Sequence, residues 1–327
     1  MTSCNNTEAN LASLPTELLL VILSPLPTNS LLPVASVSHR FHALVLRLLH
    51  QRLATAAGLD NHTLILECYH PSVKLFAGQL YCTSLGTDGL TDASSDSANC
   101  DTPVGKIARL GSVYTRFRPQ HKPPGRVVSR RYRAGDIPGS RTHPSSASRQ
   151  QQEVGDGGLV TDTVSLEAFE EFSQLCTVTN LVKIGPLRGL FVSIVEVGDG
   201  MIRVWRDWLA QQAAAGRANS SEIDQSSTVR AGLPDRADQP LNPTDDPSIL
   251  WVNNSNNSVG IKFSVTERKW QRDTPVLFAS EQEVAVSYQI HFEELLIKTS
   301  RLLLRLEQSH VMEQNQSGKA VVFGTFG

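Results

Sequence analysis

The chain has 327 residues, of which 40% are hydrophobic, and its formal net charge is −2. This length suggests about two structural units, and the near-neutral charge gives no global indication of a nucleic-acid or membrane-surface partner. Its mean hydropathy is −0.17. The longest apolar run near the start, Leu18–Leu23, is far shorter than the roughly 20 residues of a membrane span. We therefore expect no membrane-spanning segment.

Cysteine usage favours a reducing compartment. The cysteines are odd in number, widely spaced and without a C-x-x-C pair, so they indicate neither a disulfide framework nor a zinc site. No basic segment precedes the first apolar run, which speaks against a secretory signal. We expect a cytoplasmic and/or nuclear location. The five cysteines are Cys4, Cys68, Cys82, Cys100 and Cys176.

Residues 14–53 predict three short apolar helices that carry one acidic residue and three arginines. Pro15 suits a first helical turn, and Pro25 and Pro27 end the first helix. The second helix is expected to begin at Ser30, with Pro33 in its first turn. The third is expected to begin after Ser38 and to end at Gly58. So small a unit cannot bury this much leucine, isoleucine and valine internally, which indicates a docking surface for another protein.

A set of residues with characteristic order and spacing runs along these helices: Leu14, Pro15, Glu17, Leu18, Leu19, Ile22, Leu23, Leu26, Pro27, Leu31, Leu32, Val37, Ser38 and Phe41. In this set the helices resemble the F-box, a family that binds the Skp adaptor of cullin-RING ubiquitin ligases. The resemblance covers about 45 residues and departs from the common pattern at Phe41, where many members have tryptophan, and at Pro33.

The resemblance implies adaptor binding by helix-in-groove packing. Some of the implicated side chains must instead face the chain itself. The alternative is that the segment is only a helical cap on the domain that follows. The residues expected to contact the adaptor are Leu14, Pro15, Leu18, Ile22, Leu26, Pro27, Leu31, Leu32, Val37 and Phe41.

Beyond the F-box the sequence predicts a β-rich domain. Strands are expected at 62–69, 259–265, 284–292 and 319–324, a short helix at 166–175, and a hairpin at 188–208 that turns at Gly198-Asp199-Gly200. The spacing of 295–306 fits a strand or a helix. Irregular, disordered insertions are predicted at about 86–160 and 211–248. The expected organisation is a flexible tail (1–10), the F-box (11–58) and a β-rich substrate-recruiting domain (59–327).

The first insertion is basic between 104 and 149, with eleven Lys or Arg residues against one Asp. It is typical of a solvated loop, although residues 126–133 also fit a nuclear import signal or a site for an acidic partner. The cluster 126–133 contains one tyrosine and no tryptophan, so base stacking has little support there, and we expect no nucleic-acid partner.

The predicted fold class is α+β, with the three-helix F-box followed by a mainly antiparallel β-sandwich. This outline resembles F-box proteins of filamentous fungi, whose body is similar to phloem-lectin-type sandwiches. The runs that carry this resemblance are 64–75, 85–90, 172–186 and 286–300. It implies a domain that recruits a target protein, as in the substrate-recognition subunit of a Skp–cullin–F-box ubiquitin ligase.

No catalytic motif stands out, so we expect a non-catalytic adaptor with no cofactor and no metal. His39 and His42 lie three residues apart in the F-box, but no acidic or cysteine partner is near them in sequence. Two alternatives stay open: a scaffold that acts outside a ligase, and a carbohydrate-binding module that uses the tryptophans as a sugar platform. These tryptophans are Trp205, Trp208, Trp251 and Trp270.

Overall fold

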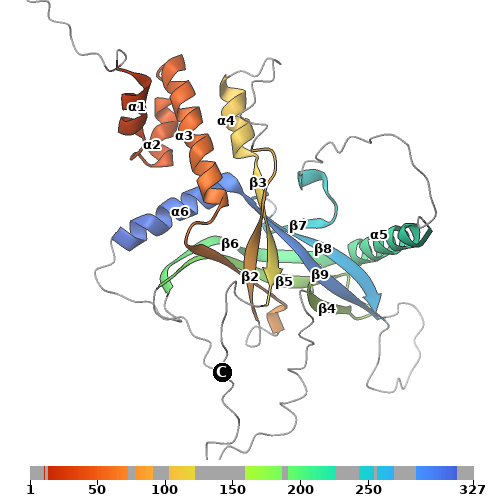
Figure 1. The fold of residues 1–327 in the computed structure, drawn as a ribbon. Helices are drawn as coiled ribbons and strands as arrows, with labels where there is room; N and C mark the ends of the chain where they lie inside the picture. Colours follow the sequence, from red (N-terminus) through yellow and green to blue (C-terminus); the bar gives the residue numbers. More distant parts are fainter. Residues whose placement is uncertain are drawn as a thin grey trace, which may run out of the picture.

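The computed structural model describes residues 11, 14–72, 78–90, 103–121, 159–185, 191–225, 243–253, 256–268 and 285–314. In this part of the chain, three N-terminal helices stand at one end of a strongly curved antiparallel sheet, and further helices pack around it (Figure 1). The predicted strand at 319–324 and the tail 1–10 lie outside the described residues.

The N-terminal helices are α1 (Thr16–Leu23), α2 (Thr28–Val34) and α3 (His39–Ala57). The Ser38 hydroxyl caps α3, as predicted, by accepting a hydrogen bond from the amide of Phe41 at 3.3 Å. The second helix begins earlier than predicted, because extended Pro27 rather than Ser30 precedes its first turn. Pro33 therefore lies near the C-terminal end of α2 instead of its beginning.

The strands form one nine-stranded sheet whose order is β6-β5-β1-β2-β3-β9-β8-β7, with β4 paired to β9. All strand pairs in the described residues are antiparallel. The strands are β1 (His62–Tyr69), β2 (Gln79–Thr87), β3 (Tyr114–Gln120), β4 (Val160–Leu166), β5 (Phe172–Ile184), β6 (Phe191–Trp205), β7 (Ile249–Trp251), β8 (Val259–Arg268) and β9 (Val286–Lys298).

The sheet curls until it is nearly closed, so that its two halves face each other across the core. A Cβ atom placed on Gly198 of β6 would lie 2.8 Å from Val259 Cγ2 of β8. The prediction of a two-sheet sandwich is not confirmed, because the strands belong to a single hydrogen-bonded sheet. The largest fully buried side chains inside the sheet include Phe117, Phe263, Phe292, Leu175 and Leu181.

The predicted hairpin at 188–208 is wrong. Phe191–Trp205 is one continuous strand, and Gly198-Asp199-Gly200 lies inside it rather than in a turn. The glycines allow close approach instead: a Cβ atom on Gly200 would lie 2.9 Å from Val252 Cγ1. Glycine is favoured both in tight turns and in strands that pack closely against a neighbour, so the composition of this segment could not distinguish a hairpin from one continuous strand.

The predicted helix at 166–175 is also wrong, because Leu166 ends β4 and Phe172 begins β5. Ser173, Leu175 and Thr177 are buried in alternation, which is the period of a strand. The ambiguous segment 295–306 contains both structures: β9 continues to Lys298, and helix α6 (Thr299–Gln314) follows directly.

Parts of the predicted insertions are regular. Helix α4 (Pro103–Gly111) and β3 lie in the first, and helix α5 (Arg206–Gln225) extends into the second. In α5, Leu209 and Ala213 are buried on one side, which gives the helix a face toward the core. Most of the basic segment 104–149, including its import-signal candidate, lies outside the described residues.

Candidate functional site

Exposed large apolar side chains are concentrated on α1, α2 and the residues just after α2. Val21 and Val37 are 68% and 70% exposed, and the neighbouring large apolar side chains are also open to solvent. We call this set the docking face; it consists of Leu18, Val21, Ile22, Leu32 and Val37.

The sequence of α1 explains how one helix serves two surfaces. The segment TELLLVIL is apolar around most of its circumference. Leu19 and Leu23, four residues apart, point inward and are buried, whereas Leu18 and Ile22, also four apart, point outward. A helix that is apolar on every side needs a second covering surface, and within the described residues α1 is covered on only one side.

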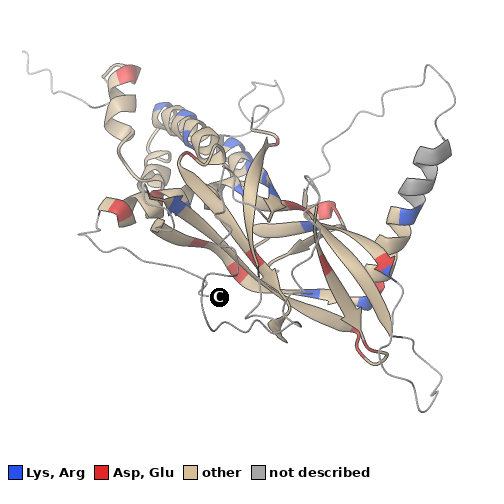
Figure 2. Cartoon of the chain, turned by 60° about the horizontal axis from the view of Figure 1, so that its bottom comes forward, with Lys and Arg blue, Asp and Glu red and all other residues tan. Residues whose placement is uncertain are grey.

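The docking face carries almost no charge. Between Leu14 and Ser38 the only Asp, Glu, Lys or Arg is Glu17, and Figure 2 shows α1 and α2 as mostly tan ribbon. Exposed prolines at 15, 25, 27 and 33 add rigid apolar surface. Charge depletion with exposed aliphatic side chains is typical of the central part of a protein–protein interface.

The structure divides the ten residues predicted to contact an adaptor. Leu31 and Phe41 are 0% and 8% exposed, so they join α1, α2 and α3 to one another. Leu14 and Leu26 are half-buried. The accessible residues are Pro15, Leu18, Ile22, Pro27, Leu32 and Val37.

Val21 is an exposed residue that the sequence analysis missed. It lies three residues after Leu18 on the outer side of α1. The family pattern does not include its position, but the all-round apolar character of α1 was a usable signal.

A polar cluster fixes the helices to the body of the protein. The Arg52 guanidinium of α3 lies 3.1 Å from Glu307 Oε1 of α6 and donates to the Ser24 carbonyl oxygen at 2.8 Å. The Glu307 carboxylate also accepts a hydrogen bond from the Thr28 amide at 3.1 Å, at the start of α2. Thus one carboxylate on α6 and one guanidinium on α3 together hold both short helices.

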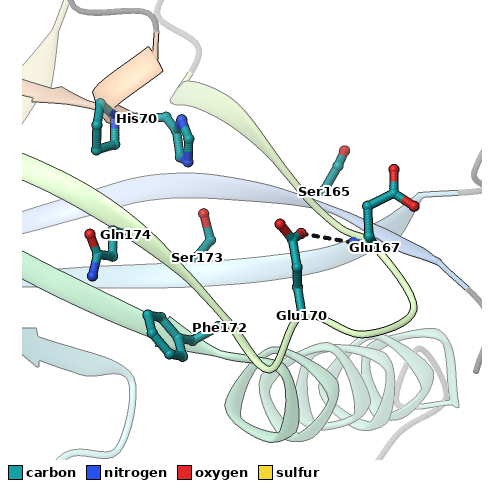
Figure 3. Close-up of a pocket in the computed structure, with 8 residues that line it drawn as sticks. His70, Ser165, Glu167, Glu170, Phe172, Ser173 and Gln174 are labelled. Atoms are coloured by element: carbon teal, nitrogen blue, oxygen red, sulfur yellow. Dashed lines mark hydrogen bonds between the residues drawn. The ribbon is translucent and has the colours of Figure 1, made fainter.

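A second candidate site is a cleft of about 490 Å³ between β4, β5 and the end of β1. Figure 3 shows His70, Ser173 and Glu170 directed toward the space between the strands. Beside it, burial raises the pKa of Asp162, while its hydrogen bond from the Thr163 amide and the nearby His70 oppose that rise. The lining residues are His70, Pro71, Ser165, Glu167, Glu170, Phe172, Ser173 and Gln174.

The described tryptophans do not form one platform. Trp208 packs edge-on against Phe263 and donates to the Pro247 carbonyl oxygen, and Trp251 packs on Tyr114. Trp205 is 45% exposed on β6, and Trp270 lies outside the described residues.

The described residues contain no group of three or more His, Cys, Asp or Glu residues that could hold a metal ion. None of the helices described is long and apolar enough to cross a membrane.

Comparison with known families identifies the N-terminal helices. Residues 11–55 match the family model described as F-box-like. This match includes the whole docking face, and F-box domains generally bind the Skp adaptor within cullin-RING ligases. No curated protein and no solved structure matches the chain.

Proposed function

We propose that this chain is the substrate-recognition subunit of a Skp–cullin–F-box ubiquitin ligase. The docking face binds the Skp adaptor, and the β-rich body binds a target protein. The observation that carries the proposal is an uncharged apolar surface left open on helices that match the F-box-like model.

In this proposal the chain is not an enzyme and needs no cofactor. Its contribution is to hold the target near the partner enzymes, because tethering raises the effective concentration of a reactant. As a subunit of such a ligase, the protein would be located in the cytoplasm and/or nucleus.

The binding energy would come from covering the outer side of α1. Fully burying a leucine or isoleucine side chain contributes about 1.5–3 kcal/mol. Leu18 and Ile22 are the best probes, since both are about half exposed and neither belongs to the internal packing. Leu14 is less suitable, because its half-buried side chain packs against the hydrophobic core.

We expect the double substitution Leu18→Glu and Ile22→Glu to weaken capture of the Skp adaptor by about 100-fold or more, since two anchors of about 1.5 kcal/mol or more each are lost. The measurement is titration of purified full-length chain with purified adaptor. Val311→Glu is the matched control, because Val311 is 55% exposed on α6, away from the docking face.

Two results would overturn this proposal. Adaptor affinity that is unchanged in the double variant would remove the docking face from the interface. Capture of the adaptor without a cullin, in a mixture that contains both, would favour a scaffold that acts outside a ligase.

A further inference from the structure

The cleft beside β4 and β5 is a gap in the sheet. The two strands leave a common turn at residues 167–171, yet they are not paired with each other: β4 pairs with β9, and residues 172–175 pair only with β6. Pairing of β1 with β5 ends at Tyr69 and Cys176, after which Pro71 has no amide hydrogen to donate. Within the described residues, two strand edges are therefore free at this point.

Free edges are templates for another strand. They present backbone amides and carbonyls that an extended peptide can pair with, and side-chain contacts then provide selectivity. The gap lies where β1 would continue if it were longer. Its volume of about 490 Å³ falls in the range of about 300–1,000 Å³ that is typical of ligand sites.

Ser173 supplies an independent sign of a ligand. It is only 9% exposed and lines the cleft, yet its hydroxyl has no hydrogen-bond partner in the described part of the chain. Figure 3 shows this hydroxyl directed into the gap. The hydroxyl oxygen is not among the buried side-chain atoms that lack a partner, so it is open to the cleft, where an inserted backbone amide or carbonyl would be a partner for it.

The acidic side chains of the cleft favour a basic occupant. Glu167 and Glu170 line it, and neither carboxylate forms an ion pair with a described Lys or Arg residue. The Arg206 guanidinium donates to the carbonyl oxygens of Glu167 and Glu170, so it fixes the backbone of the turn. The Glu170 carboxylate in turn accepts the Glu167 amide at 2.9 Å. The result is a rigid turn that presents two acidic groups.

Apolar surface lies next to these carboxylates. Phe169, at the tip of the same turn, is 83% exposed. Phe172 packs on Trp205 with 5.0 Å between ring centroids, at the start of β5. An occupant with both cationic and aliphatic side chains would match this combination of carboxylates and aromatic rings.

We propose that the cleft between β4 and β5 binds an extended basic segment of the target protein by strand addition. The segment pairs with the free edge at residues 172–175, its Lys or Arg side chains meet Glu167 and Glu170, and its apolar side chains contact Phe169 and Phe172. This peptide site would be the place where the proposed receptor holds its target. The claim that the bound target is ubiquitinated rests on the proposed function, whereas binding of the peptide does not require the Skp adaptor.

The test uses the purified full-length chain and a fluorescein-labelled peptide of alternating arginine and valine, followed by fluorescence anisotropy at low salt. We expect this peptide to bind and a glutamate–valine peptide of equal length not to bind. N-methylation of alternate backbone amides should abolish binding, since it removes the donors that strand addition requires. Hydrogen exchange should slow at 172–175 when the peptide is present.

The variant Glu167→Gln with Glu170→Gln removes both charges but keeps the size and an acceptor oxygen. Exposed ion pairs contribute about 0.2–1 kcal/mol each, so we expect a roughly 2- to 30-fold loss of affinity. The control is Glu196→Gln with Asp199→Asn, which removes two exposed carboxylates from β6 and should leave the affinity unchanged.

Several results would overturn the proposal: equal binding of the two charge patterns, full binding of the N-methylated peptide, protection at other residues, or the same loss in the control variant. Binding to a glycan array that the Glu167/Glu170 variant loses would instead assign the cleft to a sugar. Self-association that the same variant abolishes would assign it to a second copy of the chain.

Binding of the Skp adaptor is measured in a separate experiment, so the receptor proposal and the peptide-site proposal can be contradicted independently of each other. The Glu167→Gln, Glu170→Gln variant should capture the Skp adaptor normally, and the Leu18→Glu, Ile22→Glu variant should still bind the peptide. Loss of peptide binding alone would leave the receptor function in place.

Discussion

His62 shows how one buried side chain connects β1 to α6. Its Nδ1 atom lies 2.8 Å from the Asp60 carbonyl oxygen, which can only accept, so Nδ1 carries the hydrogen. Nε2 is then the acceptor for the Ser309 hydroxyl at 3.0 Å, and Ser309 in turn contacts the Ser193 hydroxyl. This arrangement needs a neutral imidazole, and burial lowers the pKa of His62 from its ordinary value of 6.5.

The lowered pKa predicts a loss of stability in mild acid. Above pH 6.5 the histidine is neutral in both states and contributes its full hydrogen-bonding energy. As the pH falls below 6.5 toward the lowered folded value, the unfolded chain takes up a proton that the folded chain does not, so the free energy of unfolding decreases. We expect this decrease to be smaller in His62→Gln than in the wild type, measured by denaturant titrations across this pH range.

The same variant should be less stable than the wild type at neutral pH by about 1–3 kcal/mol, because buried partners lose their hydrogen bonds. Parallel stability curves for the two proteins would contradict the assignment of the acid sensitivity to His62.

Prediction from sequence succeeded for features that are determined by a few residues close together in the chain. The Ser38 cap and the strand His62–Tyr69 follow from a side chain and an alternation within a few residues. Sorting Leu31 from Leu32 was not possible, because both are leucines in the same apolar run and only the position of α3 decides which is covered. The cleft was invisible for the same reason: His70 and Ser173 are about a hundred residues apart in the chain.

At the scale of elements, glycine positions determine how closely strands cross. Gly198 sits opposite the β-branched Val259, whose Cγ2 atom has little freedom to move. Gly216 of α5 is different, because a Cβ atom there would meet only the Val265 carbonyl oxygen at an ordinary 3.5 Å.

These two glycines predict opposite effects of the same substitution. Gly198→Ala should lower the free energy of unfolding by about 1–3 kcal/mol through overpacking. Gly216→Ala should raise it by up to about 1 kcal/mol, since alanine is the better helix former. Denaturant titration of both variants is the measurement, and equal signs would contradict the close approach of β6 and β8.

Strand identity was easier to predict than strand connection. The alternation in Val259–Val265 identified β8, whereas the composition of 188–208 suggested two strands where there is one. Local patterns specify a period, but the length of β6 depends on β5, with which it pairs along nearly its whole length. The single curled sheet likewise depends on long-range pairing that no short segment encodes.

At the scale of the whole molecule, the N-terminal helices and the sheet share one hydrophobic core. Buried leucines of α3 belong to the same cluster as Phe117 and Phe292 of the sheet. The Arg52–Glu307 ion pair, with side chains 18% and 25% exposed, adds a polar connection across this junction. The described helices and sheet therefore pack as one continuous hydrophobic region.

This shared core predicts one cooperative unfolding transition. All tryptophans of the chain follow residue 200, so their fluorescence reports on the body, while far-ultraviolet circular dichroism also reports on α1–α3. We expect the two signals to give coincident thermal transitions. An earlier transition in the dichroism alone would show that the helices unfold independently of the sheet.

Glu307 also has a consequence for how the protein is made. The carboxylate that holds the first residue of α2 belongs to α6, which leaves the ribosome after all the strands that the structure describes. Domains generally begin to fold during synthesis from the N-terminal side. Here the contact between α2 and Glu307 forms only after α6 has been synthesised. A messenger that stops before codon 307 would therefore yield chains whose N-terminal leucines are loosely packed and exposed to binding by chaperones.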